Sequence, residues 1–199
     1  MGLRAGGGGG PGRGRAALRM ATALGYTEHD RTMVLDLSAR APGSRHPLPA
    51  GSAVRPLRED ELGPWLDARR AGFVASLTSR GATEEQAAAH QAASMRELLP
   101  DGAATAGAAL LVLEHDGVRV GTVWVGTAQP AWVFAVEVDE GRRGQGHGRA
   151  LMLAAENAAV AAGARELVLD VFAGNAPAIR LYESLGYTVS EYTFAKTLL

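Results

Sequence analysis

The sequence contains no cysteine, which excludes disulfide bonds, thiolate catalysis and cysteine-based metal sites. Lysine is almost missing as well, because Lys196 is the only one. The formal net charge of −1 lacks the basic excess that is typical of proteins that bind nucleic acid. The longest apolar stretches, such as residues 151–162, are too short to span a bilayer, and the N-terminus lacks the apolar region of a signal peptide. We therefore expect a cytoplasmic protein that binds neither nucleic acid nor a membrane.

The first fifty residues contain little that could form a core. Residues 1–15 are mostly glycine and arginine, so we expect them to be disordered. Residues 38–52 are rich in proline, glycine and serine, as linkers are. We therefore interpret residues 1–51 as an N-terminal extension and residues 52–199 as one domain.

Residues 16–37 of this extension have a pattern of their own. Ala17–Leu37 aligns without a gap with Ala178–Leu198, and eight of the twenty-one positions are identical, including a shared Leu-Gly-Tyr-Thr run. We interpret the segment as a partial repeat of the C-terminal helix and strand, left from a tandem two-domain ancestor or added by an upstream start codon. One helix and one strand cannot bury their own apolar faces, so the segment must dock elsewhere or stay mobile. We expect removal of residues 1–50 to leave stability and activity nearly unchanged.

From residue 53 onward, strand and helix patterns alternate. Thr83 and Gln86 form a capping-box pattern at the start of one helix, and 115–117 is a hairpin turn signal. The expected strands are 53–57, 108–114, 118–126, 131–138, 166–172 and 187–199, and the expected helices are 59–80, 83–99, 146–162 and 175–185. This order, β-α-α-β-β-β-α-β-α-β, predicts an α/β fold with a mixed β-sheet and helices on both faces.

A loop rich in glycine and arginine follows the expected strand 131–138. It contains Arg142, Arg143, Gly144, Gly146 and Gly148 and leads directly into a helix. The first turn of a helix has N–H groups without intrahelical partners, and the helix dipole adds partial positive charge. Glycines allow a bulky anion to approach these groups, and arginines attract it. The loop therefore predicts a phosphate-binding site.

Two common phosphate-binding motifs do not fit this loop. A P-loop needs a lysine after its second glycine, and there is none here. The dinucleotide fingerprint G-x-G-x-x-G needs a third glycine where this sequence has Arg149 or Leu151. A glycine-rich turn without a ligand is the remaining alternative.

A second motif extends from Asn175 to Tyr187 and has the form N-x-x-A-x-x-x-Y-x-x-x-G-[FY]. Asn175 suits the N-cap of a helix, and Pro177 lies in the first turn, where a missing N–H is harmless. Tyr182 lies two turns further on, so its hydroxyl can point toward the open ends of the strands. A tyrosine that only packs in the core is the alternative.

Together, R-G-x-G-x-G after a strand ending in V-x-V and the tyrosine helix resemble the GNAT family of N-acetyltransferases, over residues 52–199. The resemblance implies a GNAT-type sheet and an acyltransferase of EC 2.3.1 type with acetyl-CoA as co-substrate. It implies that main-chain groups of Val136 and Val138 bind the pantetheine arm, which Asn175 approaches from the other side. It also implies a pyrophosphate site at Arg143, Gly144, Gln145, Gly146, His147, Gly148 and Arg149.

In such a site an amine attacks the thioester directly, in a ternary complex. Tyr182 would be the general acid that protonates the departing thiolate, and its loss should slow the reaction rather than abolish it. The general base is less clear, because residues 127–136 contain none of the carboxylates that histone-type members place there. Glu137 is the nearest candidate, and water acting through backbone carbonyls is the alternative.

The remaining polar and aromatic residues give weaker signals. We expect His90, His115 and His147 at the surface and predict no metal, because no His, Asp and Glu set has ligand spacing. Trp124 and Trp132 could line an acceptor pocket or pack in the core.

The acceptor stays open between a small-molecule amine and a peptide amine. A homodimer through the C-terminal strand is compatible with the pattern. The competing hypothesis for the whole chain is a non-catalytic CoA-binding sensor or interaction module.

Overall fold

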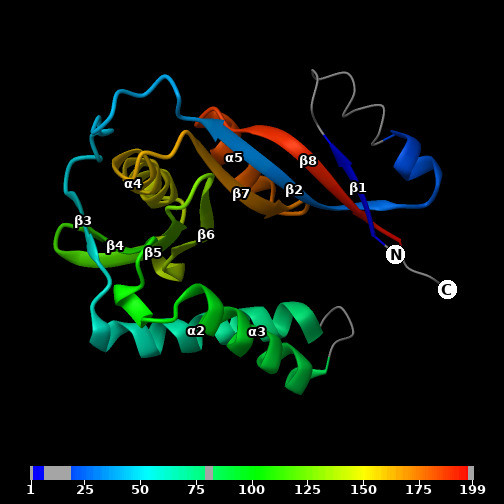
Figure 1. The fold of residues 1–199 in the computed structure, drawn as a ribbon, viewed down its shortest axis with the longest axis horizontal. Coiled ribbons are helices and arrows are strands. Elements are labelled where there is room, and N and C mark those ends of the chain that lie inside the picture. The colour runs from blue at the N-terminus through cyan, green and yellow to red at the C-terminus, as the bar shows by residue number, and fades with distance from the viewer. Residues whose placement is uncertain (1, 7–18, 79–82, 197–199) are drawn as a thin grey trace.

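The computed structural model describes residues 2–6, 19–78 and 83–196. Within these ranges eight strands form one sheet in the order β1-β8-β2-β7-β6-β5-β4-β3 (Figure 1). Only β6 and β7 run parallel, and the other neighbours are antiparallel. The strands are β1 (Gly2–Gly6), β2 (Thr27–Asp36), β3 (Ser52–Pro56), β4 (Ala108–His115), β5 (Val118–Gly126), β6 (Ala131–Val138), β7 (Glu166–Phe172) and β8 (Thr188–Ala195).

Helices cover both faces of this sheet, so the predicted fold class is confirmed (Figure 1). The helices are α2 (Glu59–Thr78), α3 (Glu84–Leu98), α4 (His147–Ala161) and α5 (Ala176–Ser184), with 3-10 turns η1 (Gly102–Ala104) and η2 (Glu140–Arg142). The larger core lies under α4 and α5 and includes Leu151 and Leu167, which are fully buried. A smaller core under α2 contains Trp65 and Trp124.

Local sequence signals explain where several elements begin and turn. Both hydrogen bonds of the predicted capping box are present, from the Gln86 backbone N–H to Thr83 and from the Thr83 backbone N–H to the Gln86 side chain. In the β4–β5 hairpin, Asp116 and Gly117 have φ values of 51° and 74°, as a type I′ turn requires.

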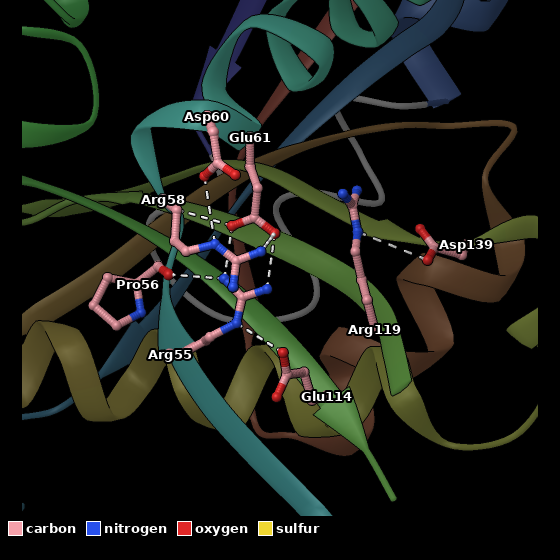
Figure 2. Close-up of polar contacts among 8 residues, drawn as sticks. All are labelled: Arg55, Pro56, Arg58, Asp60, Glu61, Glu114, Arg119 and Asp139. Carbon is pink, nitrogen blue, oxygen red and sulfur yellow. Dashed lines mark hydrogen bonds and ion pairs between the residues drawn. The ribbon is translucent and has the colours of Figure 1, made fainter. Parts of the chain in front are cut away.

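A charged network fastens α2 to the edge of the sheet (Figure 2). Arg55 of β3 donates to both carboxylate oxygens of Glu61, at 2.7 and 2.8 Å, and to Glu114 of β4 at 2.7 Å. The Arg55 bonds and the backbone N–H of Arg58 lower the pKa of Glu61 to about 2. In the same view, Arg119 of β5 lies 3.8 Å from Asp139, where β6 leads into the glycine loop (Figure 2).

The N-terminal segment is part of the sheet, which agrees with the docking alternative that the sequence left open. β2 lies between β7 and β8, with Met33 fully buried in the main core and Leu37 only 3% exposed. The sheet therefore contains strands from both sides of the expected domain boundary at residue 51. This arrangement does not agree with the expectation that removal of residues 1–50 leaves stability nearly unchanged. Gly2–Gly6, expected to be disordered, pairs with β8 as β1, whereas residues 1 and 7–18 lie outside the described ranges.

The two copies of the sequence repeat have the same local structure. Residues 19–23 are helical and lead through Gly25 into β2, just as α5 leads through Gly186 into β8. Both glycines have positive φ, 77° and 94°, which a residue with a Cβ rarely adopts. The two strands pair antiparallel to each other. Because β8 has β1 on its other side, the free strand edge suggested for a dimer is covered.

Residues 37–51, which connect β2 to β3 and contain most of the predicted linker 38–52, pass around the outside of α4 (Figure 1). The backbone N–H of His46 donates to Asn157 Oδ1 at 2.6 Å, and Asn157 Nδ2 donates to the His46 carbonyl at 3.0 Å. These two hydrogen bonds attach the segment to α4, the helix that begins at the end of the glycine loop. We call residues 37–51 the strap.

Candidate functional site

β6 and β7 separate toward their C-terminal ends. Their parallel pairing covers only Ala131–Val133 with Leu167–Leu169, and β6 has a bulge at Phe134. A cavity of about 150 Å³ occupies the opening. Its lining is Val133, Phe134, Ala135, Val136, Leu169, Asp170, Val171, Phe172, Asn175 and Tyr182. Within the described residues, the β7-facing edge of β6 therefore has no strand partner beyond Val133, so its main-chain groups are available to a ligand.

The glycine loop leads from β6 to α4 and leaves backbone amides exposed at the helix start. Gly146 is the N-cap of α4 with φ 87°, and Gly144 has φ 74°, so both need the freedom of glycine. No side chain in the described residues caps this end. The first intrahelical bonds are those from Arg149 N–H and Ala150 N–H to the Gly146 carbonyl. The preceding amides can therefore bind an anion.

A second cavity, of about 560 Å³, lies over these amides. Of the predicted site residues, Val136, Val138, Arg143, Gly144, Gly146, His147, Gly148, Arg149, Asn175 and Tyr182 line it, together with Arg142, Pro177, Ala178 and Leu181. Gln145 does not line it, and its side-chain amide donates to the Gly141 carbonyl at 3.4 Å. Three arginines and the helix N-terminus give this cavity positive charge.

The two cavities meet at Val136, Asn175 and Tyr182, which line both. Asn175 caps α5, with Oδ1 accepting from the Ala178 N–H at 3.3 Å, as its sequence position predicted. An elongated ligand with an anionic end could extend from the arginines to the opening between β6 and β7.

Tyr182 is a candidate proton donor where the cavities meet. Burial raises the pKa of its hydroxyl above the usual value near 10, so the group is protonated at neutral pH. Its ring lies 5.9 Å from that of Tyr187. Burial also raises the pKa of Tyr187, whose hydroxyl has no hydrogen-bond partner among the described residues.

His147 corrects one expectation from the sequence. Its side chain is buried rather than exposed, and its ring packs 5.0 Å from that of His115. Burial, followed by the nearby His115 and Arg142, lowers its pKa, so the ring is neutral at neutral pH. Any charge-based attraction of a phosphate to this residue therefore comes from its backbone amide, at the first position of α4.

Glu137, the predicted base candidate, lies in an ion pair. Arg69 Nη1 is 2.9 Å from Glu137 Oε1, and the guanidinium of Arg69 lies over the rings of Trp65 and Trp124. Glu137 lines neither cavity. Trp124 is 2% exposed, in agreement with the core-packing alternative for that residue.

Sequence reasoning missed Asp170. It is exposed, and it is the one carboxylate among the residues that line the two cavities. Its Oδ1 accepts a hydrogen bond from the Thr32 hydroxyl at 2.7 Å. The signal was a single charged residue at an outward position of the otherwise apolar strand 167–172, five residues before Asn175.

A comparison with known protein families assigns the fold to a class of enzymes. A model of the acetyltransferase (GNAT) family matches residues 74–187, and the chain belongs to this family. It is therefore an acyltransferase. Among the described residues, no cluster of His, Asp and Glu could hold a metal ion, and no helix is long and apolar enough to cross a membrane.

Several relatives resemble the chain over part or most of their length. The uncharacterized N-acetyltransferase YycN of Bacillus subtilis is 32% identical over 108 residues, which cover 51% of this chain and 69% of that protein. The crystal structure of YycN superposes on this chain with a TM-score of 0.67 and 26% sequence identity. The superposition covers 74% of this chain and 99% of YycN.

Two further relatives differ in how much of them is matched. The uncharacterized N-acetyltransferase YdgE of Bacillus subtilis is 27% identical over 62% of this chain and 82% of its own length. The mycothiol acetyltransferase of Corynebacterium glutamicum is 39% identical over 36% of this chain, which spans only 25% of that enzyme.

Proposed function

We propose that the chain transfers the acetyl group of acetyl-CoA to a primary amine. The observation that carries the proposal is the junction of the two cavities at Tyr182. One cavity offers bare amides and arginines to a pyrophosphate, and the other offers an open strand edge beside a phenol. A long, thin ligand with an anionic end fits this arrangement.

The pyrophosphate would be held by the amides of the glycine loop together with Arg142, Arg143 and Arg149. The predicted roles of Val136 and Val138 agree with the free edge of β6, although the Val138 carbonyl already accepts from Arg143 Nε at 3.3 Å. Asn175 would contact the same arm from the α5 side. These residues would place the thioester near Tyr182.

Acetyl-CoA, when bound, supplies a thioester carbon that a neutral amine can attack. Tyr182 would give its proton to the sulfur as the carbon–sulfur bond breaks. The attacking amine loses one N–H proton as the amide forms, and this proton restores the Tyr182 hydroxyl. Because a thiol is a good leaving group, the phenol assists the reaction without being indispensable.

The acceptor must first lose the proton of its ammonium form. We propose Asp170 for this role in place of Glu137. Asp170 shares a cavity with Tyr182, whereas the Glu137 carboxylate is paired with Arg69. Water relayed through backbone carbonyls remains the alternative to a carboxylate.

Thiol release from acetyl-CoA with a panel of small amines and peptide N-termini tests the proposal, with product masses as confirmation. We expect thiol release that depends on one class of amine, and a product heavier by one acetyl group. If coenzyme A binds in calorimetry but no amine releases thiol, a non-catalytic CoA-binding module would be the better description. The cytoplasmic location stays a proposal, and a homodimer would need a surface other than the covered edge of β8.

A further inference from the structure

β2 belongs to the segment before the matched family region, yet it borders the strand that carries Asp170. The register pairs Thr32 directly with Asp170 on β7 and with Glu191 on β8. Directly paired residues of antiparallel strands project from the same face of the sheet. The N-terminal segment therefore places a hydroxyl beside Asp170, the only carboxylate among the described residues that line the two cavities.

The contact between these two side chains is specific. The Thr32 hydroxyl donates to Asp170 Oδ1 at 2.7 Å, a short distance of the kind that a charged acceptor favours. Among the described residues, the bond from Thr32 is the one hydrogen bond to the Asp170 side chain, so Oδ2 is left for a ligand. An exposed aspartate without such a bond can move between several rotamers.

We infer that Thr32 is a positioning residue for acetyl transfer, because its hydroxyl holds the Asp170 carboxylate in the cavity that Tyr182 also lines. This inference rests on the proposed function and on the role of Asp170 as proton acceptor. It gives the N-terminal segment a part in the reaction, beyond the completion of the sheet. The acceptor amine gives its proton to Asp170 Oδ2, and Thr32 keeps its own proton throughout.

Matched substitutions at Thr32 separate positioning from packing. Thr32→Val keeps the shape and the β-branch but lacks the hydroxyl, and Thr32→Ser keeps the hydroxyl but lacks the methyl group. We expect T32V to lower kcat with the acceptor by roughly tenfold, with KM for acetyl-CoA unchanged, while T32S stays within about twofold of wild type. Asp170→Asn should lower kcat more than T32V does.

Two readouts do not depend on activity. Calorimetry should give the same Kd for coenzyme A with T32V as with wild type, since Thr32 lies outside both cavity linings. A crystal structure of T32V should show the Asp170 carboxylate in a different rotamer, or in several, while T32S keeps the wild-type one.

Full activity of T32V, or an equal loss in T32V and T32S, would overturn the inference, and so would an unchanged Asp170 rotamer in T32V. Failure of the proposed function looks different, because the wild-type chain would then release no thiol with any amine. An active wild type with a fully active D170N would exclude Asp170 as the proton acceptor and with it the role of Thr32.

Discussion

The imidazole Nε2 of His46 lies 3.1 Å from Oε2 of Glu156, and only 4% of the Glu156 side chain is exposed. The pair joins the strap to α4, with Arg40 Nη1 3.8 Å from the same carboxylate oxygen. Burial raises the pKa of Glu156 to about 7, although Arg40 and Arg149 act in the opposite direction. A carboxylate inside the protein thus titrates near neutral pH.

This raised pKa predicts a stability that falls with pH. Between the ordinary glutamate pKa of 4.5 and about 7, the folded chain retains a proton that the unfolded chain has lost, so the free energy of unfolding decreases as pH rises. Glu156→Gln cannot titrate. We expect the stability of wild type relative to E156Q to fall by on the order of 3 kcal/mol over this window in urea unfolding, at about 1.4 kcal/mol per pKa unit.

The titration of His46 overlaps that of Glu156 and has to be controlled in this experiment. Burial and Arg40 lower its pKa, which contributes a slope of the opposite sign below pH 6.5 in both proteins. Because the His46 ring lies 3.1 Å from Glu156, its titration differs between wild type and E156Q, so the two proteins are compared in a His46→Gln background. Parallel stability curves for the two proteins would show that Glu156 is not held protonated.

The position of β2 predicts that the N-terminal segment contributes to stability. Met33 is fully buried in the main core, so Met33→Ala should cost about 2–5 kcal/mol in the free energy of unfolding. Met20, in the same segment, is 65% exposed, and Met20→Ala should cost less than about 0.5 kcal/mol. Equal denaturation midpoints for the two variants would show that β2 does not belong to the sheet in solution.

The hydroxyl of Tyr182 should matter for the chemical step. We expect Tyr182→Phe to lower kcat by roughly 10- to 100-fold in a thiol-release assay, because the sulfur then leaves without its proton donor. Tyr187 is the matched control, since it is buried next to Tyr182 and its hydroxyl has no partner among the described residues. Tyr187→Phe should keep full activity, and a Y182F enzyme as fast as Y187F would remove Tyr182 from the mechanism.

The two ends of α4 offer a comparison of glycines. Gly146 and Gly163 have φ values of 87° and 80°, and an added Cβ would meet no atom within 4 Å at either position. Alanine at either position should therefore cost a similar roughly 1–2 kcal/mol of stability. Only Gly146→Ala should also weaken coenzyme A binding in calorimetry, because the added Cβ would enter the open space through which the phosphates approach the proposed cradle. Equal affinities for the two variants would argue against the cradle.

Much of the fold could be predicted from local sequence signals, and the sheet order could not. The strands 131–138 and 166–172 have the predicted bounds, because apolar alternation and flanking turns define them. The position of β2 depends on pairing between residues far apart in sequence, such as Met33 with Leu169 and with Val189. Hydrophobic periodicity indicates that a segment is a strand, but it does not indicate which other strands that segment pairs with.

The site residues also divide into those that the sequence could identify and those that only the tertiary structure reveals. The glycine loop and the tyrosine helix are contiguous motifs, so their residues could be named from the sequence and lie together in the structure. Asp170 owes its relevance to the separation of β6 and β7 and to a hydroxyl from β2, 138 residues away in sequence. Glu137 was a candidate base in the sequence because its ion pair with Arg69 of α2 is a tertiary contact, which local patterns do not reveal. Such contacts decide which carboxylates are free to react.

A crystal structure of the chain with coenzyme A tests the central claim most directly. The account predicts pyrophosphate oxygens within hydrogen-bond distance of the backbone amides at residues 144–148, and a pantetheine arm along β6 with its sulfur beside the Tyr182 hydroxyl. Coenzyme A bound elsewhere, or a glycine loop and strand opening closed by side chains in crystals that contain the ligand, would contradict it.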